Sequence, residues 1–367
     1  MGEKISQWIE SLLRMPVAAG LDISDQSIKY AKFYGKRKYV LEAWGEIIVP
    51  EGIIVNGEIQ KEEELTRIFT EWIKGEGKKL RSSFFTVSLP EEKGFVRMIQ
   101  LPKVRQDEIH NAIRWEIEAN IPMAQEELFF DYEIIQPLED HLNHFDVMLT
   151  AFPKAIVESY VRVLKKSGIK ISALELESQA IVRSSVADLK TKAACAVVDM
   201  GRFRTSFIIF AGGAIFFTTT VELGGKAFEE NIARAMGVSM ERARALKISA
   251  GLNKRVNNGA IYAALVPSIA VLADELERTI EYYQNHTAHA HGAASQVEII
   301  LLTGGDANLF GVDTYLASVL KVPVTRINPF LAFSGETRES RIFPITRRNA
   351  LGFAASLGLA LRGIRDA

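Results

Sequence analysis

Two stretches of the chain, residues 20–39 and 197–216, repeat one order of hydrophobic, acidic and glycine positions. Each stretch predicts a buried strand that ends at an aspartate, a tight polar turn, a second strand, a glycine turn and a third strand. The matching residues lie 177 positions apart in every case: Asp22 and Asp199, Phe33 and Phe210, Gly35 and Gly212. A repeat at a fixed offset indicates a duplicated structural unit.

The two aspartates of the repeat are the first candidates for chemistry. A single aspartate at a strand end is usually turn chemistry, but two in matching strand contexts favour a paired site. Backbone N–H groups of such turns bind anions, and the carboxylate can hold a hydrated cation. Two turns that face each other could therefore grip a metal-bound polyphosphate from both sides.

A third element follows the second copy of the repeat. Residues 297–302 predict a continuous apolar strand, which runs through Thr303-Gly304-Gly305-Asp306-Ala307 toward a helix. A glycine pair between a strand and a helix lets a flat ring approach the backbone closely. Its order after the second hairpin places it beside the same site.

Three other apolar patterns have helical spacing. Ile109, Ile113 and Ile117 predict a helix face that packs in a core. Phe228, Ile232 and Met236 predict a second helix face. Gly237 should end this helix, and Ser239 can cap the next one. Residues 1–16 predict an amphipathic helix that docks on the protein itself, on a partner or weakly on a membrane; its apolar residues are Ile5, Trp8, Ile9, Leu12 and Leu13.

Composition narrows the class of protein. The chain has 367 residues, enough for two or three domains, and 44 Lys and Arg against 45 Asp and Glu give a net charge of −1. This balance argues against a general nucleic-acid binder, which carries a basic surplus. The single cysteine, Cys195, excludes a disulfide framework and fits a reducing cytoplasm. His286, His289 and His291 have no thiol partner at metal-ligand spacing.

Two uncharged stretches could suggest membrane spans. Residues 205–221 contain Gly212-Gly213 and fit a hairpin of buried strands better than a spanning helix. Residues 256–273 contain Pro267 and continue directly into a charged segment. Residues 1–15 lack the continuous apolar region of a signal peptide. We therefore expect a cytoplasmic protein.

The two hairpins and the glycine pair, in this order, resemble the actin-like ATPase superfamily. In that superfamily two phosphate hairpins and an adenosine-binding turn surround Mg-ATP between two lobes. Residues 349–360 are similar to its second interlobe helix, and residues 167–186, with Glu175, Glu177, Ser178 and Gln179, to the first. The resemblance implies an α/β fold of two lobes with duplicated RNase H-like cores.

The segment between the hairpins narrows the resemblance to the PilM family of type IV pilus assembly proteins. Its matching motifs are Leu101-Pro102, Asp107-Glu108-Ile109, Trp115-Glu116-Ile117-Glu118-Ala119-Asn120-Ile121-Pro122 and Asp131-Tyr132-Glu133-Ile134-Ile135. Leu223-Gly224-Gly225, Asn328-Pro329-Phe330 and residues 357–362 are also similar. The resemblance runs from about Ala19 to Arg362, and it implies a small α+β insert in place of the actin subdomain and a helical cap on the second lobe.

The resemblance also implies ATP and Mg²⁺ as cofactors. The phosphates would lie between the 22–27 and 199–205 turns, with the adenine on the Gly304-Gly305 turn. The implied nucleotide-binding residues are Asp22, Ser24, Ser27, Lys29, Asp199, Gly201, Thr205, Gly224, Gly225, Lys247, Thr303, Gly304, Gly305 and Asp306. Asp22 and Asp199 would hold Mg²⁺ through water, and Glu177 or Gln179 could orient an attacking water unless both lie on a solvated helix face.

This chain departs from the family pattern at two places. The family's first hairpin reads Asp-Ile-Gly-Ser-Ser, whereas this chain has Ser24 and Asp25 at the third and fourth positions. Loss of the glycine restricts backbone approach to a phosphate, and Asp25 adds negative charge near it. The family's Ala-Glu-x-x-Lys, whose Glu and Lys face the adenosine, has Arg244 in place of the Glu and keeps Lys247.

We expect five segments in two lobes. The N-terminal helix covers 1–16, and the first-lobe core combines 17–90, 154–190 and 341–367. The insert at 91–153 should belong to this first lobe. The second-lobe core combines 191–225 and 275–340, and the cap covers 226–274.

The implied function is a cytoplasmic ATP-binding adaptor at the inner face of the inner membrane. Family members capture the cytoplasmic N-terminal peptide of the membrane protein PilN, in a groove between the first-lobe core and the insert. Other inner-membrane pilus components and a second copy of the chain are further possible partners. The sheet edges expected to line the groove are the strands around 84–89 and 145–151, each bounded by a proline.

Two other functions stay open from sequence. A slow Mg-dependent ATPase or kinase would use Asp22 and Asp199 on the metal side of the phosphates. An FtsA-like filament-forming protein would need a membrane anchor, and residues 1–15 are the candidate.

Overall fold

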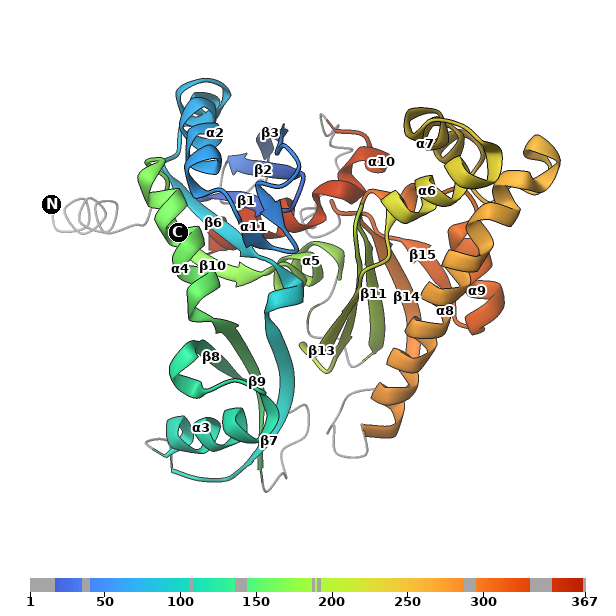
Figure 1. Cartoon of the computed structure of the whole chain (residues 1–367). Coiled ribbons are helices and arrows are strands. Elements are labelled where there is room, and N and C mark those ends of the chain that lie inside the picture. Colours follow the sequence, from blue (N-terminus) through green and yellow to red (C-terminus); the bar gives the residue numbers. More distant parts are fainter. Residues whose placement is uncertain are drawn as a thin grey trace, which may run out of the picture.

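The computed structural model describes residues 17–34, 40–105, 108–135, 144–186, 189, 193–286, 295–330 and 345–365. The helix expected at 1–16 lies outside these residues. Two sheets stand side by side with helices around them, and the insert lies below the first sheet in Figure 1.

The first sheet has five strands in the order β10-β6-β1-β2-β3. The strands are β1 (Ala19–Ile23), β2 (Ser27–Tyr34), β3 (Val40–Ile48), β6 (Phe84–Leu89) and β10 (Lys170–Leu176). On one face, α2 (Glu62–Lys74) and α4 (Lys154–Lys166) bury Phe69 and Tyr160 against it. On the other, α11 (Ala354–Arg365) packs against β1 and β2 and against α5 (Glu177–Ser185).

The second sheet begins with the order β15-β14-β11-β12-β13. Its strands are β11 (Ala194–Met200), β12 (Thr205–Ala211), β13 (Ala214–Val221), β14 (Val297–Thr303) and β15 (Val324–Arg326). In both sheets the first three strands of the unit form an antiparallel meander, and the fourth lies parallel to the first on its other side. The predicted duplicated cores are therefore confirmed by an identical strand order.

Helices of the second lobe lie within and beyond residues 226–274, where we expected the cap. They are α6 (Gly225–Met236), α7 (Met240–Ala250), α8 (Ala260–His286) and α9 (Val312–Leu320). Gly237 ends α6 with a φ of +64°, and the Ser239 side chain accepts a hydrogen bond from Arg242 N at the start of α7. Phe228 and Ile232 are buried in the core, as expected.

The region 256–286 is long and apolar enough to cross a membrane by length and composition. One face of α8 is buried in the second-lobe core through Ile261, Leu265, Ile269 and Leu276, and 28% of the apolar window is buried in all. Pro267 lies within the helix.

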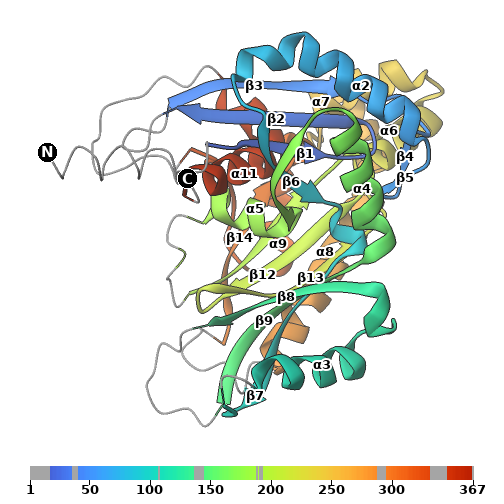
Figure 2. The ribbon, with the colours of Figure 1, turned by 90° about the vertical axis from the view of Figure 1, so that its left-hand side faces the viewer.

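The insert consists of β7 (Phe95–Pro102), α3 (Ile109–Asn120), β8 (Leu128–Ile135) and β9 (His144–Pro153). Its three strands are ordered β7-β9-β8, and α3 covers them with Ile109, Ile113 and Ile117, which confirms the predicted helix face (Figure 2). Backbone pairing joins β7 to β13 at Arg97 and Phe217. The insert therefore extends the second-lobe sheet, although we expected it to belong to the first lobe.

The expected groove strands are both internal to their sheets. β6 lies between β10 and β1, and β9 lies between β7 and β8. That prediction was wrong, because the edges on this side of the molecule are β8 and β10. Small elements complete the fold: β4 (Ile54–Val55), β5 (Glu58–Ile59) and α10 (Arg347–Ala350).

Candidate functional site

The two aspartates of the repeat lie at the ends of β1 and β11, and we call the region between these two strand ends the cleft. Asp22 is buried, and its Oδ1 accepts a hydrogen bond of 3.1 Å from the Ser88 hydroxyl. That hydroxyl accepts one of 2.9 Å from Ile23 N, so Ser88 fixes the strand end. The negative charge of Asp22 contributes to the raised pKa of Asp199, so the structure brings the predicted pair together.

Two further carboxylates complete the cleft floor. Burial raises the pKa of Asp22, and the positive charge of Lys29 opposes this shift. Burial also raises the pKa of Asp199, to about 6. Lys29 opposes this second shift, and the negative charges of Asp22 and Glu91 add to it. Burial and the carboxylates of Asp22, Asp199 and Glu91 raise the pKa of Glu177 well above its usual value. Lys29 lies near Asp22, Glu177 and Asp199, where its positive charge opposes the rise in the pKa of each.

Glu91 was not singled out from the sequence. It is 3% exposed, and its Oε2 accepts a hydrogen bond of 2.9 Å from Ser178 N in the first turn of α5. Burial raises its pKa, and the Ser178 amide opposes that shift. Only its place directly after the strand 84–89, which ends beside β1, could have indicated it.

The Gly304 turn closes the cleft beside Asp199. Gly304 has a φ of +86°, and a Cβ there would lie 2.6 Å from Asp199 Oδ1, so only glycine fits. Its amide donates to Leu351 O at 3.1 Å. No atom lies within 4 Å of the Cβ position of Gly305, which leaves open space where a ring could stack.

The glycines of the second lobe pack together near this turn. Gly225 N donates to Gly201 O at 3.0 Å, and a Cβ on Gly225 would collide with the Asp306 carboxylate. Thr205 Oγ1 donates to Leu223 O at 2.7 Å, which fixes the same corner. These predicted residues therefore shape one wall of the cleft.

Lys247 is buried and bonded within the protein. Its Nζ lies 2.6 Å from Asp306 Oδ1, 2.9 Å from Glu229 Oε1 and 3.2 Å from Gly225 O. An ammonium group has three donors, so these contacts use them all. Arg244, which replaces the family's Glu, is mostly exposed. Lys247 thus anchors α7 to the cleft wall in this structure.

The first hairpin turn is held by hydrogen bonds between its own residues. Ser24 N and Ser24 Oγ both donate to Ser27 O at 2.9 Å. Asp25 points across the cleft, where its Oδ2 lies 2.7 Å from Arg204 Nη2 of the second hairpin turn. The two turns are therefore joined by an ion pair.

The cleft suits a hydrated rather than a fully protein-bound metal. Among the residues that the structure describes, no group of three His, Cys, Asp or Glu side chains could hold a metal ion. Mg²⁺ usually keeps several waters and is held by one or two carboxylates together with phosphates. Asp22 and Asp199 fit such an ion, which would bring positive charge among the buried acids.

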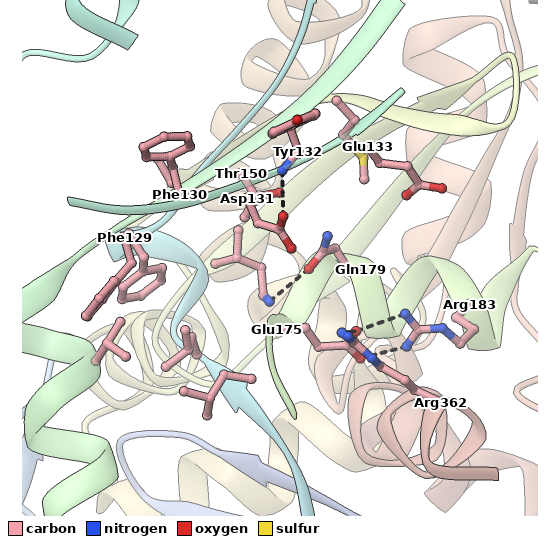
Figure 3. A pocket seen from close by; sticks show the side chains of 17 residues that line it. Phe129, Phe130, Asp131, Tyr132, Glu133, Thr150, Glu175, Gln179, Arg183 and Arg362 are labelled. Atoms are coloured by element: carbon pink, nitrogen blue, oxygen red, sulfur yellow. Dashed lines mark hydrogen bonds and ion pairs between the residues drawn. The ribbon is translucent and has the colours of Figure 1, made fainter. Parts of the chain in front are cut away.

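A second cavity, of about 480 Å³, lies between the insert and the first-lobe core (Figure 3). Its walls include the edge strands β8 and β10 and the first turn of α5; among its residues are Leu89, Phe129, Asp131, Glu133, Met148, Thr150, Phe152, Val157, Leu174 and Leu176. We define this cavity as the groove. Gln179 lines the groove and accepts a bond from Leu176 N, so the structure separates it from Glu177 in the cleft.

A buried ion triad forms one side of the groove. Arg183 contacts both oxygens of Glu175, at 2.6 and 2.9 Å, and Arg362 Nη1 lies 2.7 Å from Glu175 Oε2. The Glu175 side chain is 1% exposed. This triad ties β10, α5 and α11 together, and no local sequence signal indicated it.

Two lobes with duplicated sheets around an acidic cleft define an actin-like ATPase fold. Solved structures support this class: ethanolamine utilization protein EutJ of Carboxydothermus hydrogenoformans is 15% identical with a TM-score of 0.56, over 95% of this chain and 90% of that one. MreB5 of Spiroplasma citri bound to ADP is 12% identical with a TM-score of 0.54, over 86% and 92%. These two likenesses concern the fold alone.

The family follows from a closer match. The model of the family described as type IV pilus assembly protein PilM matches residues 20–364, so the chain belongs to this family. A structure of the PilM–PilN type IV pilus biogenesis complex is 25% identical, with a TM-score of 0.78, over 95% of this chain and 99% of that one. The resemblance inferred from the sequence is confirmed.

Proposed function

We propose that this protein is a cytoplasmic adaptor of a type IV pilus machine, which captures an extended N-terminal peptide of a PilN-like membrane protein in the groove. The observation that carries the proposal is the groove between two sheet edges, β8 and β10. A peptide in extended form can add to such an edge, with backbone hydrogen bonds for affinity and side-chain pockets for specificity. The similarity to a PilM–PilN complex supports PilN as the partner.

The chemistry of the groove suits a short apolar segment with a basic flank. Apolar side chains such as Leu174 and Met148 line it, and the Glu175 carboxylate is neutralised by its two arginines. Asp131 and Glu133 lie exposed on β8 at its rim. Cytoplasmic segments next to membrane spans are rich in Lys and Arg, and such residues would meet these acids.

A charge in the groove tests this proposal. Phe129 is 47% exposed and lines the groove, so Phe129→Asp should spare the fold. We expect it to weaken binding of the PilN-like peptide at least tenfold, measured by calorimetry, because the peptide would bury an unpaired carboxylate. The control is Ile134→Asp, on the opposite face of β8 and 39% exposed, which should bind normally. Equal affinity of both variants and the original protein would contradict the groove assignment.

We also propose that the cleft binds Mg-ATP at the inner face of the membrane, with Asp22 and Asp199 toward the metal. The ADP-bound MreB5 of the same fold supports a nucleotide site. A slow ATPase is the second candidate, since Glu177 lies in the cleft with the two aspartates. A base must be ionised to accept a proton, and burial raises the pKa of Glu177 well above its usual value, which disfavours the ionised form. This makes Glu177 a weaker base and favours retention of ATP over rapid turnover.

A further inference from the structure

Arg204 spans the gap between the two turns that we propose hold the nucleotide phosphates. It belongs to the second turn, which is closed by a 2.9 Å hydrogen bond from Gly201 N to Arg204 O. Its Nη2 lies 2.7 Å from Asp25 on the first turn, and its Nη1 contacts Glu92. Glu92 lies in the short helix Glu91–Lys93, which leads into β7 of the insert. One guanidinium thus joins the second lobe to the first lobe and to the base of the insert.

The Asp25 carboxylate is held firmly for this contact. It accepts hydrogen bonds from Asn56 N at 3.1 Å and Gly57 N at 2.9 Å, both in the β4–β5 hairpin. The side chains of Arg204, Asp25 and Glu92 are 19%, 10% and 15% exposed. Water screens this group far less than an exposed pair, so it holds the lobes more effectively than the 3.6 Å contact of Lys226 with the exposed Glu51.

We propose that Arg204 recognises the terminal phosphate of a nucleoside triphosphate, and that Asp25 and Glu92 hold it as a latch across the ligand-free cleft. The inference rests on the proposed nucleotide binding. A guanidinium presents the same paired donors to a carboxylate and to a phosphate, so a phosphate can replace Asp25 as its partner. Two other cations near the cleft have partners of their own: Lys247 is fully bonded, and Arg202 of the second turn lies 3.1 Å from Glu229 Oε2.

The latch would couple the cleft to the groove. When a phosphate binds Arg204, Glu92 loses its arginine partner. Glu92 lies just before β7, the first strand of the insert. β7 pairs with β9 along its whole length, and β9 carries β8, whose edge lines the groove. Nucleotide binding therefore changes the restraint on one wall of the groove.

Distances across the cleft test the latch. Spin labels on Glu63→Cys in α2 and Glu241→Cys in α7, both exposed, with Cys195→Ser, report the separation of the lobes by pulsed electron resonance. We expect Asp25→Ser and Arg204→Gln each to lengthen or broaden the ligand-free distance distribution. Arg162→Gln is the matched control, because it breaks a 2.7 Å arginine pair with Glu62 inside the first lobe. Unchanged distances in both latch variants would overturn the proposal; if Asp25→Ser does not fold, Asp25→Asn replaces it.

Nucleotide affinity separates the latch from the function on which it rests. Removing Asp25 frees Arg204 Nη2, while Nη1 keeps its contact with Glu92, and removes a negative charge, so Asp25→Ser should bind a non-hydrolysable Mg-ATP analogue at least fivefold more tightly. Arg204→Gln should bind it at least fivefold more weakly. Normal nucleotide affinity in Arg204→Gln would overturn the recognition role alone. No nucleotide binding by any variant would overturn the cleft assignment itself, whereas the adaptor role is judged separately by peptide binding.

Discussion

The cleft and the groove differ in how far their buried carboxyl groups are neutralised by basic side chains. The cleft gathers Asp22, Glu91, Glu177 and Asp199 around Lys29, and burial raises the pKa of every one of these carboxyls. The groove has one buried carboxylate, Glu175, held by two arginines. A site with surplus buried negative charge is stabilised by a ligand that brings cations, whereas a neutralised site is ready for an apolar one. The contrast therefore favours the assignments we propose, a metal–nucleotide ligand for the cleft and a peptide for the groove.

The largest expected effect is at the groove triad. Glu175→Ala would leave the side chains of Arg183 and Arg362, which are 17% and 33% exposed, without their carboxylate, which costs about 3 kcal/mol of unfolding free energy. The control, Glu62→Ala, removes a partly exposed pair with Arg162 and should cost less than about 1 kcal/mol. Urea unfolding curves measure both. Similar losses in the two variants would show that the triad is not the strong link we infer.

Bound nucleotide should add a somewhat smaller amount to the free energy of unfolding. A ligand that binds only the native state at 100 times its Kd adds about 2.7 kcal/mol, so Mg-ATP should raise Tm. Asp199→Asn should lose most of this rise while its peptide affinity stays normal, because the groove does not contain Asp199. A full nucleotide response in Asp199→Asn would remove Asp199 from the metal side of the cleft.

Asp199→Asn should also raise the stability of the ligand-free protein. With a native pKa of about 6 against an ordinary 3.8, Asp199 holds its proton longer in the native state. Its contribution to stability is present below pH 3.8 and is lost as the pH rises through 6. Replacing it should therefore stabilise the protein on the order of 1 kcal/mol at pH 7.5, and the gain should vanish near pH 3.8. A loss of stability at pH 7.5 in the absence of ligand would contradict the crowded-acid account.

Local patterns in the sequence were sufficient for much of the fold. The repeat of Asp22 and Asp199 predicted two matching sheets, and the period of Ile109, Ile113 and Ile117 predicted the buried face of α3. Gly304 was correctly placed at a tight turn beside Asp199. Each of these features depends on residues close in sequence or on the repeat itself.

Features that depend on distant pairing were missed. The order of strands in a sheet decides which ones are edges, and it made β8 and β10 the edges at the groove, whereas β6 and β9 line the groove as internal strands. Arg362 meets Glu175 across 187 positions, so no motif could indicate the contact. Glu177 and Gln179 are only two residues apart, but side chains at that spacing leave a helix on different faces.

Hydrogen exchange with and without the PilN-like peptide measures the peptide's position most directly. We predict that the peptide slows amide exchange in β8 (Leu128–Ile135) and β10 (Lys170–Leu176), where backbone groups at the two edges gain partners. The equally placed edge strand β3 (Val40–Ile48), on the far side of the first sheet, should exchange as before. Protection of β3 or of α3 with none in β8 and β10 would contradict capture in the groove.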